Sequence, residues 1–162
     1  MSAPTSPARK RRFVRISVTL GLSALAHATL TWPLRATIAF FAGGALVAFV
    51  AEAVGVYLGW LDHHVGSTLR GVPLYVLFGW TGTVYVAVRI ALLVTGGWAA
   101  VPLAATLATA YDVLTDHRGV ADGLWSYGRG LPGPRYRGVP WWNFAAWFAI
   151  SSLTAALAVP FL

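Results

Sequence analysis

The chain has 162 residues and a formal net charge of +7. Hydrophobic residues make up 57% of it and charged residues only 10%, against roughly 25% charged residues in ordinary soluble domains. With a mean hydropathy of +0.66, this composition excludes a soluble globular protein and indicates an integral membrane protein. The sequence contains no cysteine, which excludes disulfide bonds, thiolate catalysis and iron–sulfur ligation.

Five apolar segments approach the roughly 20 residues that a helix needs to cross a bilayer. We therefore expect an all-α fold, an integral membrane helical bundle of about five transmembrane helices. We assign residues 1–12 to a basic cytoplasmic tail and residues 13–162 to a single membrane domain. The expected spans are residues 13–30, 34–53, 72–94, 98–116 and 139–162.

The basic sequence RKRR, at residues 9–12, precedes the first span. No convincing small-residue cleavage site follows that span, so we interpret it as an uncleaved anchor. Five spans place the N-terminus and the loops after the second and fourth spans on one side, which the positive-inside rule makes cytoplasmic. Topology and contact with lipid headgroups then explain most of the net charge, and we expect no nucleic-acid partner. The basic residues on this side are Arg9, Lys10, Arg11, Arg12, Arg15, Arg70, Arg118, Arg129, Arg135 and Arg137.

A motif occurs twice in the chain. The sequence LRGVP at residues 69–73 is followed by Trp80, and YRGVP at residues 136–140 is followed at the same spacing by Trp147. Each copy lies between two spans, which predicts two tandem helix-loop-helix repeats related by a pseudo-twofold axis along the membrane normal. The first span is an addition outside them. The repeats comprise about residues 34–94 and 98–162.

Three of the five acidic residues lie in or at the mouth of these apolar spans: Glu52, Asp112 and Asp116. An ionisable group there costs a few kcal/mol or more unless it is neutral, paired or facing a polar cavity, so it indicates a functional site. We match Asp112 to Glu52 in the repeat and expect both near the cytoplasmic end at nearly equal depth, with Asp116 one turn below Asp112 on the same helical face. The alternative is that they are structural groups that bond to neighbouring helices, or that Asp116 is interfacial.

The two prolines of the motif suit the first turn of an ascending helix. Trp80 and Trp147 then lie about two turns inside, which predicts a pocket near the cytoplasmic interface, rimmed by carboxylates and floored by indoles. The alternative for each tryptophan is packing or a place in the interfacial aromatic belt, and the alternative for each arginine is an anchor of topology. The candidate substrate-binding residues are Trp60, Trp80, Trp125, Asn143, Trp147, Arg70 and Arg137.

The histidines do not indicate a metal site. A diiron or zinc enzyme needs several histidines at helical spacing, whereas the chain has four in total and His63 and His64 are adjacent. An alternative role for His64 and His117 is to relay protons or to contact lipid headgroups. We interpret His27 as a packing residue or as a partner in an interhelical hydrogen bond.

The order of the motifs AEAVG, Gly-Trp, GVP-x6-Trp, YDVLTD, Gly-x-Trp and RGVPWWNFAAW resembles the membrane-bound carotenoid biosynthesis proteins of the CruF type. These are the carotenoid hydratases, which include bisanhydrobacterioruberin hydratase. The resemblance covers roughly residues 51–148, although the chain is shorter than the family usually is and the loop after its Glu reads LGWLDHHVGSTL. The matching positions are Glu52, Gly55, Asp112, Asp116, Pro140, Asn143 and Trp147.

The resemblance implies addition of water across a terminal carbon–carbon double bond of an acyclic C40 or C50 carotenoid, without a redox cofactor. We expect Glu52 and Asp112 to act as the acid and base pair, in either order, with Asp116 and Asn143 as polar support. Burial favours a carboxyl group that keeps its proton, and indole rings stabilise a cation by roughly 0.5 to 2 kcal/mol each. The expected partners are the carotenoid or isoprenoid substrate, membrane lipids, and a second copy or a partner subunit. The alternatives are a non-catalytic carotenoid- or isoprenoid-binding membrane protein, a subunit of a carotenoid-modifying complex, and a transporter.

Overall fold

The computed structural model describes residues 6–128, 130 and 132–162. Arg129, one of the loop arginines used to orient the chain, and residues 1–5 of the expected tail lie outside this part. Helix α1 begins at Pro7, where proline suits the first helical position, with Ser6 as its N-cap. The basic RKRR sequence is therefore helical and continuous with the first apolar span.

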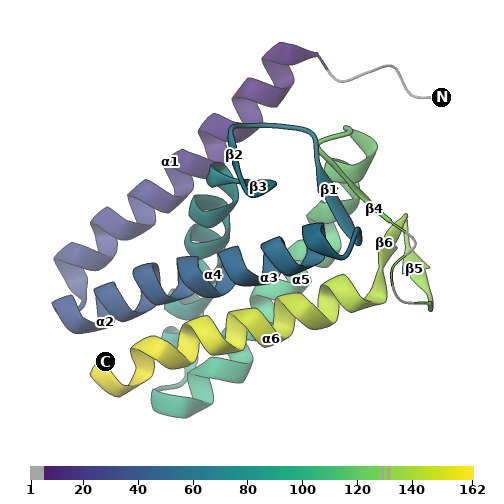
Figure 1. The fold of residues 1–162 in the computed structure, drawn as a ribbon. Coiled ribbons are helices and arrows are strands. Elements are labelled where there is room, and N and C mark those ends of the chain that lie inside the picture. The colour runs from purple at the N-terminus through teal and green to yellow at the C-terminus, as the bar shows by residue number, and fades with distance from the viewer. Residues whose placement is uncertain (1–5, 129, 131) are drawn as a thin grey trace.

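Five long helices build the described part of the chain, as the apolar pattern predicts (Figure 1). The second of them is one rod with a π-helical turn in its middle, and short 3₁₀ turns precede the fourth and follow the fifth. In chain order they are α1 (Pro7–Thr31), the rod of α2 (Leu34–Ile38), a π-helical turn (Ala39–Gly43) and α3 (Gly44–Tyr57), α4 (Leu74–Val94), a 3₁₀ turn (Gly97–Ala99) with α5 (Ala100–Ala121), and α6 (Trp141–Ala158) with a 3₁₀ turn (Val159–Phe161).

Four of these helices are long and apolar enough to cross a membrane: α1, the α2–α3 rod, α4, and α6 with its final turn. Helix α5 is equally long but less apolar, because it continues past the expected span and carries Asp112, Asp116 and Arg118 in its second half. The expected fold class, an all-α membrane bundle, is confirmed.

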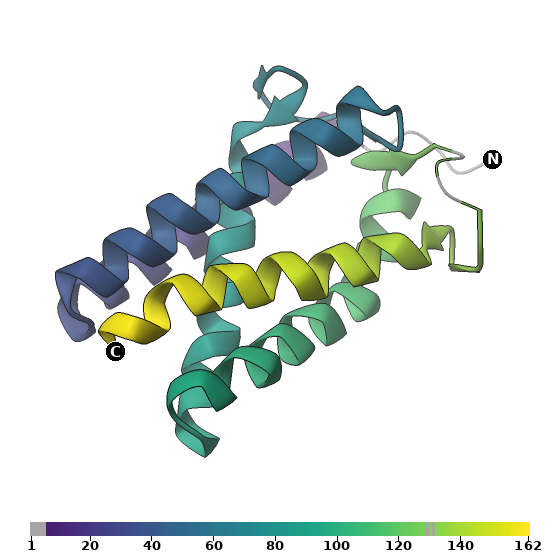
Figure 2. The same cartoon turned by 60° about the horizontal axis from the view of Figure 1, so that its bottom comes forward.

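Helix α4 is the centre of the packing, with α1, α3 and α5 against it (Figure 2). The contact between α1 and α4 is close because Gly21 faces the backbone of Phe78, where any Cβ would collide. Helices α5 and α6 pack against each other, and α6 also packs against α3. The outcome is a bundle in which α1 and α5 lie on different sides of α4.

Short strands, which the sequence pattern did not predict, organise the two long loops. Strand β1 (Leu61–His63) of the first loop pairs antiparallel with β4 (Trp125–Tyr127) of the second. Each loop then forms a small hairpin, β2 (Thr68–Leu69) with β3 (Val72–Pro73) and β5 (Arg135–Tyr136) with β6 (Val139–Pro140). The turn residues Arg70 and Arg137 both have φ of 51°, and each is followed by a glycine, which adopts positive φ without strain.

The strands and the N-terminal end of α1 lie toward one end of the bundle, away from the C-terminus and the α1–α2 turn (Figure 1). An aromatic cluster fills the opposite end, where the rings of Trp32 and Tyr85 lie 4.8 Å apart and Phe40 packs edge-on against both. Nδ1 of His27 lies 2.7 Å from the hydroxyl of Tyr85. The expectation of an interhelical bond for His27 is confirmed.

Candidate functional site

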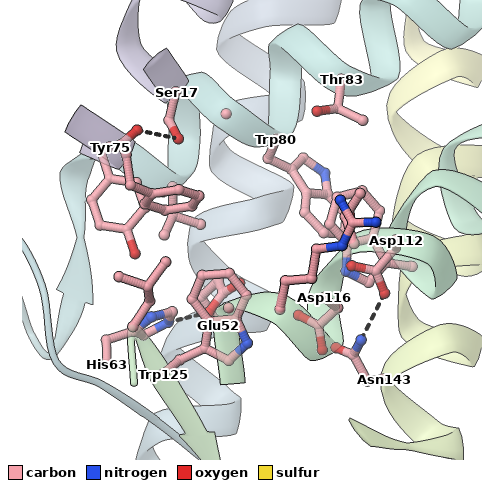
Figure 3. Close-up of a pocket in the computed structure, with 18 of the residues that line it drawn as sticks. Ser17, Glu52, His63, Tyr75, Trp80, Thr83, Asp112, Asp116, Trp125 and Asn143 are labelled. Carbon is pink, nitrogen blue, oxygen red and sulfur yellow. Dashed lines mark hydrogen bonds and ion pairs between the residues drawn. The ribbon is translucent and has the colours of Figure 1, made fainter. Parts of the chain in front are cut away.

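The three carboxylates of the apolar spans line one cavity of about 320 Å³ near the strands (Figure 3). Glu52 reaches it from α3, and Asp112 and Asp116 reach it from successive turns of α5. Asp112 is only 3% exposed and Asp116 only 6%. Helix α4 supplies Tyr75 and Trp80 to the same cavity, so the polar groups are enclosed by aromatic side chains.

Glu52 is paired with His63. Nε2 of the imidazole lies 2.8 Å from a carboxylate oxygen of Glu52, and the His63 side chain is 4% exposed. Strand β1 turns His63 toward the cavity while the adjacent His64 faces Ser126 and Asp62. Within the described part of the chain, Nδ1 of His63 is buried without a hydrogen-bond partner.

Asp112 accepts a hydrogen bond from the side-chain amide of Asn143, at 2.8 Å. The hairpin β5–β6 ends in Pro140, which begins α6 and sets Asn143 in the first turn of that helix. Both side chains are buried. Buried polar groups are normally hydrogen-bonded, and this bond from the amide fixes the orientation of the Asp112 carboxyl group.

Asp116 accepts a hydrogen bond of 3.0 Å from the hydroxyl of Tyr127, on strand β4. Burial raises the pKa of the Tyr127 phenol well above its ordinary value, and the nearby charges of Asp116 and Asp112 raise it further. The phenol therefore stays protonated and remains a donor to Asp116.

The structure corrects the expected match between Glu52 and Asp112. Glu52 lies eleven residues before its partner His63, and Asp116 lies eleven residues before its partner Tyr127. The two helices also end alike, each followed by a glycine of positive φ. Counted from these ends, Asp116 is the counterpart of Glu52, because helix termination and not hydropathy fixes the depth of a side chain.

Two stacked indoles form one wall of the cavity. The ring centroids of Trp80 and Trp147 lie 3.6 Å apart, with 39° between the ring planes, and both residues line the cavity, as does Trp125. This contact joins α4 to α6 at the depth that the spacing from each proline predicts. Both rings border the space that also holds the carboxyl groups.

Three of the predicted site residues do not line this cavity. Trp60 packs instead on Trp142, at 5.5 Å between ring centroids. Arg70 and Arg137 occupy the hairpin turns, where Arg137 donates to Nε2 of His117 at 3.1 Å. A role of Trp60, Arg70 and Arg137 in substrate binding remains a prediction without support from this geometry.

A second, smaller cavity of about 50 Å³ lies between α3 and α6 and adjoins the larger one. Glu52, Asn143 and the stacked indoles line both cavities, whereas Asp112 and Asp116 line only the larger one. Glu52 therefore lies between two spaces of different size.

Several residues of the cavity escaped the sequence analysis. Phe13 and Ser17 come from α1, which lies outside the predicted repeats. His63 and Tyr127 come from the loop strands β1 and β4, and Tyr75 comes from the first turn of α4. The shared eleven-residue spacing to His63 and Tyr127 was the signal that could have found two of them. In the described part of the chain, His, Asp and Glu side chains form no group of three or more suited to a metal ion.

The comparison with protein families gives a match over residues 13–162, to the family described as carotenoid biosynthesis protein. No curated protein and no solved structure matches the chain. The family match covers α1 from Phe13 onward, the other four long helices and every residue that lines the cavity.

Proposed function

Because the chain belongs to the family of carotenoid biosynthesis proteins, we propose that it adds water to a terminal double bond of an acyclic carotenoid. One observation carries the proposal: three acidic side chains and a closely packed pair of indoles line one cavity. Hydration of an alkene needs a proton donor, stabilisation for a cation and a base for water, and it changes no oxidation state overall. The chemistry therefore asks for no redox cofactor.

In the first step the carboxyl group of Asp112 transfers its proton to the less substituted carbon of the double bond. A carbon–hydrogen bond forms, the π bond breaks, and a tertiary cation and a carboxylate result. Asp112 suits this role because it is deeply buried and held by Asn143. Like charges in one enclosed space oppose each other, so a site with three carboxyl groups retains a proton.

The stacked indoles of Trp80 and Trp147 stabilise the cation. Each indole ring contributes roughly 0.5 to 2 kcal/mol of cation–π attraction. The wall position of the pair, facing the carboxyl groups, supports this role.

In the second step water attacks the cation and Glu52 accepts the proton that the water loses. We place this water in the smaller cavity, whose 50 Å³ exceeds the roughly 10 to 15 Å³ that one water needs. Glu52 borders that cavity and Asp112 does not, which supports the base role that we propose for Glu52. His63 then exchanges the proton with Glu52, and a proton returned to Asp112 completes the cycle.

Asp116 and Tyr127 act as polar support in this scheme. The phenol donates to Asp116, so this carboxylate has a partner and adds negative charge beside the forming cation. We propose further that the two halves arose as a tandem repeat, and that the chain crosses the membrane several times with its N-terminus in the cytoplasm. The strands of the two loops and the start of α1 lie toward the same end of the bundle (Figure 1), which supports this orientation.

The test is expression in a host that accumulates lycopene or bisanhydrobacterioruberin, followed by mass analysis of the pigments. We expect products heavier by one or two waters. The matched control is Asp62→Asn, which removes an exposed carboxyl group outside both cavities and should leave the products unchanged. Unmodified pigment that copurifies with well-folded protein would replace the hydratase by a carotenoid-binding protein.

A further inference from the structure

The mouth of the larger cavity lies between α1 and α5. Tyr75 and Trp80 of α4, only 5% and 6% exposed, form its floor. The exposed residues of its lining come from the two flanking helices, with Ile16 of α1 57% exposed and Tyr111 of α5 51% exposed. A cavity whose floor is buried and whose flanks are exposed opens along those flanks.

The mouth is closed toward the strands. Arg9 of α1 forms an ion pair with Asp122 at the end of α5, at 3.0 Å, and the ring of Phe13 packs on Trp125 with 5.7 Å between centroids. These contacts join α1 to α5 and β4 at the end where the loops and the polar surface lie. Further along α1, Ile16 and Leu20 border the opening.

The opening therefore faces sideways from the bundle. Helix α1 is among the helices long and apolar enough to span a membrane, and Ile16 follows the basic residues at its start. An apolar, exposed side chain at that place on a spanning helix contacts lipid chains. The rim near α1 is suited to apolar chains, whereas the closed end carries the charges.

We infer that the substrate reaches the cavity laterally from the bilayer, through the mouth between α1 and α5, with one end inside and the rest of its chain outside. This rests on the proposed function for the class of ligand, a linear apolar polyene. The volume of about 320 Å³ lies near the lower limit of roughly 300 to 1,000 Å³ for pockets that hold drug-sized ligands. A forty-carbon chain exceeds such a space, but its terminal units fit.

Because the chain has no native cysteine, a single introduced cysteine can be labelled selectively to block the mouth. The variant Ile16→Cys is labelled with a bulky, polar methanethiosulfonate reagent, which a reductant later removes. The matched control is Leu22→Cys, because Leu22 lies on the same helix, is 50% exposed and does not line the cavity. Purified protein is mixed with lycopene in detergent, and retained pigment is measured by absorbance after size-exclusion chromatography.

We expect the labelled Ile16→Cys protein to lose pigment binding and to regain it after reduction, while labelled Leu22→Cys binds as the unlabelled protein does. Recovery on reduction separates a blocked mouth from a damaged fold. Equal binding by both labelled proteins, or no binding by the unmodified chain, would overturn the inference.

The same samples separate this inference from the proposed reaction. Pigment that binds, is blocked at Ile16 and is never hydrated supports lateral access and rejects the hydratase. Hydrated product formed by fully labelled Ile16→Cys protein supports the hydratase and rejects this route.

Discussion

The two halves of the bundle share a backbone plan but differ in their buried polar groups. In the first half Glu52 pairs with His63, and in the second half Asp116 pairs with Tyr127 at the same spacing. The second half adds the pair of Asp112 with Asn143. At the corresponding places, one turn before Glu52 and three residues after the first proline, the first half has the apolar residues Ala48 and Val76.

This difference separates support of the site from its chemistry. The equivalent pairs connect α3 to β1 and α5 to β4, the strand that follows each helix. The pair of Asp112 with Asn143 has no counterpart in the first half. It holds the most deeply buried of the three carboxyl groups in the cavity that the two indoles also line. The four substitutions below test whether the asymmetry between the halves is the source of activity.

The largest effect is expected for Asp112→Asn, which keeps the shape but removes the proton that we assign to the alkene. The initial rate of formation of hydrated pigment should fall about 10²- to 10⁴-fold, the usual contribution of a general acid. In D₂O the recovered substrate should carry no deuterium. A rate near that of the wild-type chain would show that the proton comes from a group other than Asp112.

Glu52→Gln should lower the same rate by about 10²-fold, because the attacking water loses its base. Its signature differs from that of Asp112→Asn. In D₂O, Asp112 can still transfer a deuteron to the double bond, and the cation can lose a proton to form the alkene again. Mass spectrometry should therefore detect deuterium in the recovered substrate. Absence of deuterium would reverse the assignment of acid and base.

Tyr127→Phe should reduce the rate about tenfold, since a hydrogen bond to a charged group contributes about 1.5 to 3 kcal/mol and part of it is retained through solvent. Burial raises the pKa of this phenol, so the loss should be equal at neutral and mildly alkaline pH in a rate profile. Tyr136→Phe, at an exposed residue of β5, is the control. A loss that disappears at alkaline pH would show that the phenol ionises.

Trp80→Phe should have the smallest effect, about threefold to tenfold on the rate, because phenylalanine retains a ring but has a weaker attraction for a cation. Trp98→Phe, at a residue that is exposed and outside both cavities, should not change the rate. Thermal unfolding of both variants checks that the fold is intact. An unchanged rate for Trp80→Phe would remove the Trp80 indole from the mechanism.

The features that could be predicted from the sequence are those that depend on the residues of a single helix. Hydropathy located the long helices, and the cost of a charge in an apolar run singled out Glu52, Asp112 and Asp116. The proline spacing placed Trp80 and Trp147 at matching depths. These depend on local composition and helical geometry alone.

Features that depend on contacts between distant segments were not predictable in the same way. Strands β1 and β4 have three residues each and form only because two loops meet, so no periodicity marks them. His63 was read as one of two adjacent histidines, and its direction depends on that pairing. The contribution of Phe13 and Ile16 was missed because the packing of α1 on α4 brings them to the cavity.

The pairing of β1 with β4 has a mechanical consequence. His63 and Tyr127, the partners of carboxyl groups from different halves, lie on two strands held in one register. A displacement of either strand is transmitted through the ladder of backbone hydrogen bonds to the other. His63 and Tyr127 would therefore move together, so that the partners of Glu52 and Asp116 are positioned by one shared element.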